Sequence, residues 1–203
     1  MAEYVFDFTG GTLCLDFANT VSNRATPDPV EHLQRYDDWL AWSRQAGLQA
    51  PGESKSLERL ARRHPDRAQA TLERALALRE SLYAIFSAIA AKHAPPPEAL
   101  AALNRALPAA MARPRIVAGT TSYTLQWHSE EDALDAPLGP IVRSTAELLT
   151  SAVELAKVRE CAAEGCAWLF LDTSRNKQRR WCDMKVCGNR NKARRYYRRQ
   201  REA

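Results

Sequence analysis

The chain has 203 residues, of which 45% are hydrophobic and 26% are charged, with 8 Gly and 11 Pro. This length suits one ordinary domain with a small appendage, and the composition excludes a low-complexity or disordered protein. No apolar run approaches the roughly 18 residues that a membrane helix needs, and the first ten residues lack the cationic start of a secretory signal. We therefore expect a cytoplasmic protein with no membrane partner.

The net charge of +5 is divided unevenly along the chain. From Lys157 onward there are 14 Lys and Arg against 5 Asp and Glu, whereas residues 1–156 hold 15 bases against 19 acids. A mildly acidic body with a strongly basic tail predicts that the tail binds a polyanion. A solvated basic helix that only aids solubility is the alternative.

The first 92 residues predict a short strand followed by helices. Tyr4–Phe8 alternates between apolar and polar residues, as strands do. Thr12 is expected to cap a helix that carries Leu13, Phe17 and Val21 along one face. Further helices are expected at about 35–46, 54–63 and 66–92. The last has an apolar stripe that is typical of a packed core rather than of a ligand pocket.

The middle of the chain continues this mostly helical pattern. A helix is expected near 98–110, a β-hairpin over 115–117 and 122–127, and a long helix from about 140 to 158. Residues 1–156 thus predict a mostly α domain with a small sheet or hairpin, large enough to bury its own core. The lone Cys14 is best explained as a buried small hydrophobic residue.

Four of the five cysteines lie within the basic tail. Cys161, Cys166, Cys182 and Cys187 form two C-x4-C pairs separated by fifteen residues. This spacing is typical of a metal site, because each pair can place two thiolates on one knuckle of backbone. Disulfides are the alternative, but they need an oxidising compartment. All four histidines lie upstream, so the site would be all-cysteine and closed, which favours one structural zinc ion.

Residues 157–203 are therefore expected to form a small four-cysteine zinc finger of treble-clef-like design. Its predicted parts are a knuckle, a hairpin made by Trp168–Leu171 and Arg179–Trp181, and a basic helix that ends near Arg201. Trp181 is expected to pack beneath the hairpin. A segment of about 47 residues cannot build a sufficient core, so removing zinc should unfold the finger and spare the body.

The basic helix carries its arginines in rows at helical spacing, and like charges at that spacing repel unless a partner neutralises them. Arg suits phosphate, and most of these residues would position a nucleic acid rather than read its sequence. Asn189 and Asn191 could read a base edge, since Asn pairs well with adenine. The candidate nucleic-acid contacts are Arg175, Lys177, Arg179, Arg180, Asn189, Arg190, Asn191, Lys192, Arg194, Arg195, Arg198 and Arg199.

Two motifs carry a resemblance that covers nearly the whole chain. The segment from Cys161 to Lys192, with Cys187-Gly188-Asn189-Arg190 at its end, resembles the CGNR-type zinc finger of bacterial proteins. The residues Phe6–Gly11 and Leu15–Thr20 are similar to the start of the ABATE domain that usually precedes it. The resemblance implies a stress-induced transcription regulator whose finger binds zinc through the four cysteines and also binds DNA.

Several functions remain open from the sequence. The first is a regulator that binds double-stranded DNA, with a body that forms a homodimer or senses an unknown small molecule. An RNA-binding or ribosome-associated module would use the same charges and aromatic residues. A zinc module that binds an acidic protein is a third possibility. Catalysis is not expected, because no nucleophile elbow, P-loop, dinucleotide fingerprint or H-E-x-x-H motif is present.

Overall fold

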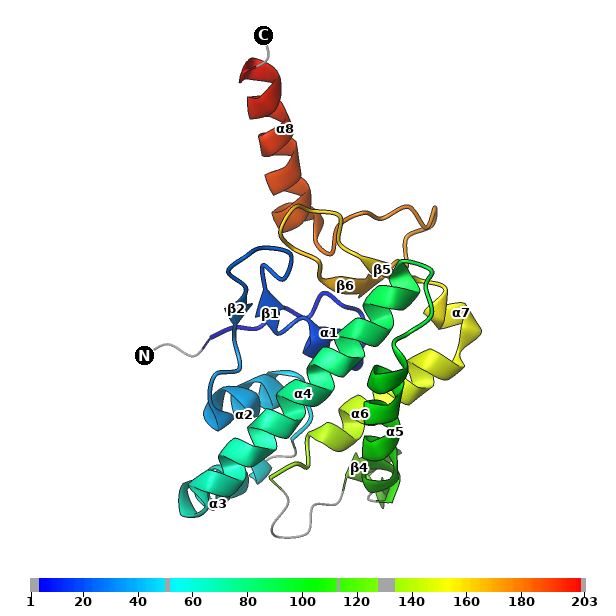
Figure 1. Cartoon of the computed structure of the whole chain (residues 1–203). Helices are drawn as coiled ribbons and strands as arrows, with labels where there is room; N and C mark the ends of the chain where they lie inside the picture. Colours follow the sequence, from blue (N-terminus) through cyan, green and yellow to red (C-terminus); the bar gives the residue numbers. More distant parts are fainter. Residues whose placement is uncertain (1–3, 50–51, 113, 128–133, 202–203) are drawn as a thin grey trace.

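We describe a computed structural model that covers residues 4–49, 52–112, 114–127 and 134–201. Helices dominate the described residues, and three two-stranded antiparallel sheets accompany them (Figure 1). The helices are α1 Leu13–Ala18, α2 Tyr36–Gln45, α3 Glu53–Arg63, α4 Pro65–Ala90, α5 Pro97–Ala112, α6 Leu138–Thr150, α7 Ala152–Leu155 and α8 Asn189–Arg201, with a π-helical turn η1 at Met184–Gly188. The strand pairs are β1 Val21–Ser22 with β2 Val30–Glu31, β3 Pro114–Ala118 with β4 Tyr123–Trp127, and β5 Val158–Glu160 with β6 Leu169–Leu171. The predicted fold class, a mostly helical body with a small four-cysteine finger, is confirmed.

The short helix α1 lies at the centre of the body, where α2, α4 and α6 surround it (Figure 1). Four of its six residues are apolar and fully buried, and its Phe17 ring lies 5.3 Å from the Trp39 ring and 5.2 Å from the Trp42 ring. The long helix α4 packs its own apolar stripe, including Leu82 and Phe86, into the same core. The strongest apolar periodicity in the sequence therefore belongs to a helix face that packs into the core and not to the lining of a pocket.

The first predicted strand is wrong. Residues 4–8 form no strand, and the Gln45 side chain binds two of their backbone groups in place of a neighbouring strand. The backbone N–H of Phe6 donates to Gln45 Oε1 at 3.0 Å, and Gln45 Nε2 donates to the carbonyl of Tyr4 at 2.8 Å. The helix expected to reach Val21 also ends early, at Ala18, and Val21 begins β1.

The predicted helix over 140–158 is broken at Ser151. Ser151 adopts an extended backbone after α6 and its hydroxyl caps α7 by accepting from the N–H of Glu154. The chain then forms β5, which pairs with β6 in the register Val158 to Leu171. The prediction that β6 pairs with Arg179–Trp181 is therefore wrong, because residues 158–160 occupy that place and residues 179–181 form no strand.

Candidate metal centre and nucleic-acid interface

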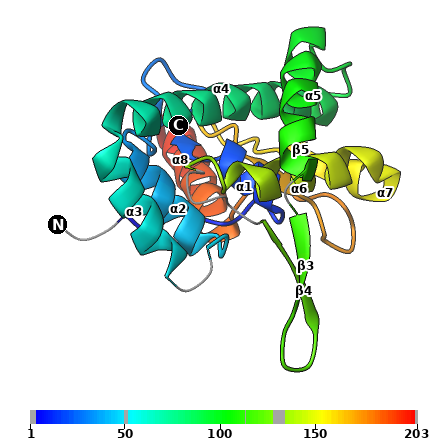
Figure 2. The same cartoon turned by 90° about the horizontal axis from the view of Figure 1, so that it is seen from below.

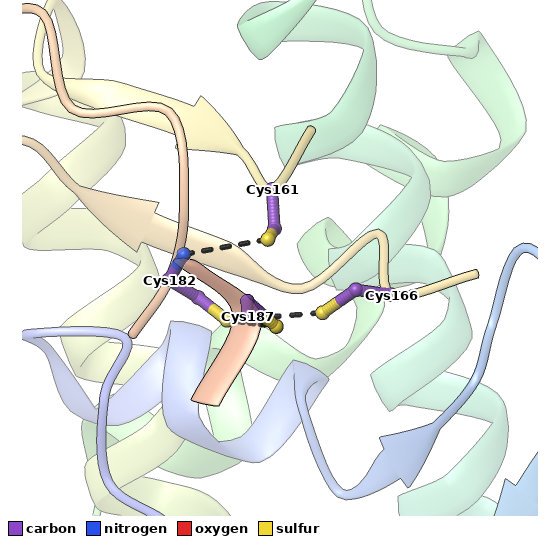
Figure 3. A group of neighbouring side chains, drawn as sticks. All are labelled: Cys161, Cys166, Cys182 and Cys187. Carbon is purple, nitrogen blue, oxygen red and sulfur yellow. Dashed lines mark hydrogen bonds between the residues drawn. The ribbon is translucent and has the colours of Figure 1, made fainter. Parts of the chain in front are cut away.

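The four cysteines of the tail meet at one point. Cys161 and Cys166 lie in the loop that joins β5 to β6. Cys182 lies just before the turn η1, and Cys187 lies within it (Figure 3). Their sulfur atoms all lie within 4.8 Å of one another, and all four side chains are buried. In this loop Gly165 has a φ of 81°, and an added Cβ there would lie 2.8 Å from Thr26, so the tight knuckle requires glycine.

The sulfur positions fit a tetrahedral metal ion. Zinc–thiolate bonds of about 2.3 Å imply sulfur–sulfur edges of about 3.8 Å in a regular tetrahedron. Both the Cys166–Cys182 and the Cys182–Cys187 sulfur pairs lie 3.7 Å apart. Four buried thiolates fill the four positions of a tetrahedral ion, so the site is closed, and it holds one structural zinc ion.

Donors around the cluster suit sulfurs that carry negative charge. The backbone N–H of Cys182 donates to Cys161 Sγ at 3.4 Å, and Arg190 Nη2 donates to Cys187 Sγ at 3.6 Å. Four thiolates around Zn²⁺ leave a formal charge of about −2, so the Arg190 guanidinium compensates part of it. The first arginine of the basic helix thus belongs to the metal centre.

The cysteine pKa values indicate how zinc binding depends on pH. Hydrogen bonds from the side chains of Cys166 and Cys182 lower the pKa of Cys161. Hydrogen bonding to Cys161 and burial raise the pKa values of Cys166 and Cys182. Zinc binds thiolates, so binding must displace protons from the thiols whose pKa values are raised. Zinc affinity therefore falls as the pH falls.

A few aromatic and polar side chains complete the finger. Trp168 and Trp181 pack against the cysteine cluster, and Phe170 is fully buried in it. Trp181 thus packs within the finger, although the hairpin beneath which it is predicted to lie does not form. The Arg179 guanidinium lies 4.6 Å from the centre of the Phe170 ring. Its nitrogens also donate to the carbonyls of Trp181 and Cys182. Arg179, a candidate nucleic-acid contact, is therefore bound inside the finger.

Asp172 closes the loop between β6 and the second cysteine pair. It is 1% exposed and accepts from the backbone N–H groups of Ser174 at 3.0 Å and Arg179 at 2.9 Å. The turn-forming composition of residues 172–176 indicates such a loop in the sequence. The same residues do not reveal that Asp172 fixes the position of Arg179.

The finger is joined to the body through buried hydrogen bonds. Asn19, which follows α1, donates to the carbonyl of Leu169 and accepts from its N–H, both at 2.8 Å. Beside it, the Leu171 N–H donates to the carbonyl of Gly10 at 2.9 Å, and Trp168 Nε1 donates to the carbonyl of Val21 at 2.7 Å. Asn19 of the body therefore bonds both backbone groups of Leu169 in β6, as a neighbouring strand would. Its polarity at the end of an apolar helix is the only sequence signal of this role.

The cationic side chains on the outside of the finger lie in three segments. These are the loop after β6, the turn η1, and the projecting helix α8, which extends away from the body to the C-terminus (Figure 1). The exposed members are Arg175, Lys177, Arg180, Lys185, Lys192 and Arg194. We call this set of exposed cations the basic face.

Several candidate contacts have partners within the chain. Arg194 forms an ion pair of 3.0 Å with Glu164, and Arg180 lies 5.8 Å from the centre of the Trp181 ring. Asn189 Nδ2 donates to the carbonyl of Lys185 at 2.9 Å, and Asn191 is half-buried on the first turn of α8. The side chains of Arg195, Arg198 and Arg199 lie outside the described residues, so their predicted role stays a prediction.

None of the helices in the described part of the chain combines the length and the apolar character required to span a bilayer.

Comparison with known families matches both parts of the chain. Residues 11–152 match the ABATE model, described as "Putative stress-induced transcription regulator", and residues 157–200 match the CGNR zinc finger. A search of curated proteins found no match. The cysteine cluster supplies the metal site that the second family is named for. The chain therefore belongs to the ABATE family and carries a C-terminal CGNR zinc finger.

Proposed function

We propose that this protein regulates transcription by binding double-stranded DNA through the basic face of its zinc finger. The observation that carries this proposal is the helix α8, which projects from the body with Lys192 and Arg194 exposed. Thirteen residues give a helix of about 20 Å, and the major groove is about 12 Å wide, so such a helix can enter it. The family assignment supports a regulatory role.

The zinc centre supports this function by position rather than by chemistry. Its ligands Cys182 and Cys187 hold the end of the loop that carries Arg175 and Lys177 and the turn η1 that leads into α8. The loop and the helix then present their cations on one rigid unit, which lowers the entropic cost of binding a phosphate backbone. We propose that the protein acts in the cytoplasm by binding, with no catalytic step of its own.

Salt dependence of binding tests the proposal. We expect zinc-loaded protein to bind a DNA duplex with an affinity that falls steeply with salt, by about 0.9 in logarithmic slope for each phosphate contact. The double variant Arg175→Ala/Arg194→Ala should weaken binding and reduce that slope by roughly 2. The charge-matched variant Arg62→Ala/Arg63→Ala on α3 removes two exposed arginines of the body and should leave the slope unchanged.

Two results would contradict the proposal. An unchanged slope in the finger variant would remove the basic face from the interface. Structured RNA that outcompetes the duplex at equal salt would favour the RNA-binding alternative. That alternative has one observation in its support, the exposed ring of Tyr197 among the arginines of α8, because exposed aromatic rings stack on unpaired bases.

A further inference from the structure

A β-hairpin extends from the body without a covering layer (Figure 2). We call this hairpin, residues 114–127, the arm. Its register pairs Ile116 with Leu125 and Ala118 with Tyr123. Because alternate residues of a strand share a face, these four apolar residues lie on one face of the arm, while Arg115 and Val117 lie on the other.

The apolar face of the arm is largely open. Ile116 is 74% exposed, Tyr123 is 78% exposed, and Leu125 is 38% exposed. A two-stranded hairpin alone is only marginally stable in water, and an amphipathic ribbon gains stability when its apolar face is covered. Clustered exposed apolar side chains of this kind mark an interaction surface.

A groove of matching chemistry lies beside the root of the arm. It has a volume of about 540 Å³ between α4, α5 and α6. Most of its lining is apolar, with small side chains such as Ala77, Ala106 and Val142, and the charged residues Arg74, Arg105 and Asp135 line it as well. Ala109 and Ala136, which lie close before and after the arm in sequence, also line it, whereas none of the described arm residues does. The chain therefore presents an apolar protrusion next to a largely apolar groove.

We propose that two copies of this chain form a dimer in which each arm lies in the groove of the other copy. A protrusion and a groove on one chain are self-complementary, and a two-fold axis lets both contacts form at once and closes the assembly. The arm and the groove belong to the family's regulatory body rather than to its finger, so this dimer does not depend on the proposed nucleic-acid binding.

The size of the arm favours this arrangement over a simple contact between two arms. Strands of five residues are about 17 Å long and a two-stranded ribbon is about 10 Å wide, which gives a footprint of about 170 Å² for each face. Two arms packed face to face would bury about 350 Å², far below the roughly 1,000 Å² of a specific interface. Reciprocal insertion makes two such contacts and buries about 700 Å², and on this proposal the surfaces of α5 and α6 that border each groove supply the remaining area.

Analytical ultracentrifugation of the full-length, zinc-loaded protein without nucleic acid tests the dimer. We expect the wild type to dimerise, and Ile116→Glu or Tyr123→Glu to raise the dimer dissociation constant by at least roughly tenfold. Val117→Glu is the matched control, because it places the same charge on the opposite face of the same strand. Circular dichroism and zinc content should stay at wild-type values in all three variants, since these positions are exposed.

Mixing variants tests whether the arm occupies the groove. Ala109→Glu, which replaces a small apolar side chain of the groove by a larger charged one, should also dissociate the dimer. A mixture of Ile116→Glu and Ala109→Glu proteins should recover part of the association, because one intact arm can still meet one intact groove. A dimer that tolerates Ala109→Glu would overturn the arm-in-groove arrangement.

Two further outcomes would overturn the proposal altogether. The first is a wild type that stays monomeric at its highest soluble concentration. If native mass spectrometry then shows a small molecule bound, the groove is a ligand site instead. The second is a Val117→Glu variant that dissociates the dimer as strongly as Ile116→Glu, because the apolar face would then have no special role.

Discussion

The body and the finger are stabilised in different ways. The body buries Trp39, Trp42, Phe17 and Phe86 in one continuous core with aliphatic side chains from six helices around them. The finger has a second cluster of six buried residues, and four of these are the metal-binding cysteines. A cluster in which most side chains are thiols cannot exclude water from much apolar surface, so the ion supplies what packing does not.

The two regions nevertheless share structure. Val158, Leu169 and Leu171 of the finger's hairpin belong to the body's core, and Asn19 hydrogen-bonds to the backbone of β6. The sequence predicts that the body survives loss of zinc while the whole finger unfolds. The shared core refines this expectation: β5 and β6 should stay folded with the body when zinc is lost.

Removal of zinc should have the largest effect, because it should unfold most of the finger and leave the body folded. Structural zinc contributes about 10–16 kcal/mol in small zinc-finger peptides, so chelation or Cys182→Ser should abolish the fixed structure of the metal loops and α8. Hydrogen exchange should show lost protection in residues 161–167 and 179–201 and retained protection in α4, β5 and β6.

Cys14→Ala is the matched control for that experiment. Cys14 is fully buried in α1, so its replacement should lower body stability but leave zinc content unchanged. Loss of protection throughout α4 on chelation would show that the body depends on the metal as well.

Asn19→Ala should break the link between the two regions. It leaves the N–H and the carbonyl of Leu169 buried without these partners, which we expect to cost about 3 kcal/mol of unfolding free energy. Urea denaturation with zinc in excess measures the change, and Asn104→Ala on the exposed face of α5 is the control. A loss of unfolding free energy no larger than that of the control would mean that the apolar contacts of Leu169 alone hold the finger in place.

Asp16 should make the stability of the body depend on pH. Burial raises the pKa of this carboxyl from 3.8 to about 7, although the Gly10 N–H donates to it at 2.7 Å. Between these two pKa values the folded state holds a proton that the unfolded state has lost, so stability falls as the pH rises from about 4 to about 7 and then levels off.

Asp16→Asn removes that dependence because the amide does not titrate. Its carbonyl can still accept from Gly10, so we expect the variant to be more stable than wild type at pH 8 by about 2 kcal/mol, roughly half of what the full pKa shift represents. Thermal melts over this pH range measure the difference, with the exposed Asp28→Asn as control. A variant that keeps the wild-type slope would assign the pH dependence to another group.

Glu164→Gln should have the smallest effect on stability. Its ion pair with Arg194 is largely exposed, with 74% of the Glu164 side chain and 48% of the Arg194 side chain accessible, and such pairs contribute about 0–1 kcal/mol. The substitution removes an acid from the basic face, so DNA affinity should rise by a few-fold at low salt. Arg194→Ala should lower it, and equal affinities for both variants would show that this pair lies outside the interface.

Local patterns in the sequence determined much of this protein. The doubled C-x4-C spacing determined the zinc ligands, because two close thiols share one knuckle wherever the rest of the chain goes. Apolar periodicity determined α2, α3, α4 and α5 to within a few residues, because a helix satisfies its own backbone and needs only one buried face. The β3–β4 hairpin followed from two extended runs around a short turn.

Tertiary structure decided the rest, because those features depend on partners distant in sequence. Residues 4–8 had strand character, but Gln45 supplied the hydrogen bonds that a neighbouring strand would have made. Residues 158–160, rather than 179–181, paired with β6, because that choice buries Val158 and Leu171 in the body's core. Likewise, only the folded finger separates Arg179 and Arg190, which bind within it, from the arginines that face solvent. Charge along the chain reports how many cations there are, while packing determines which of them remain available to a partner.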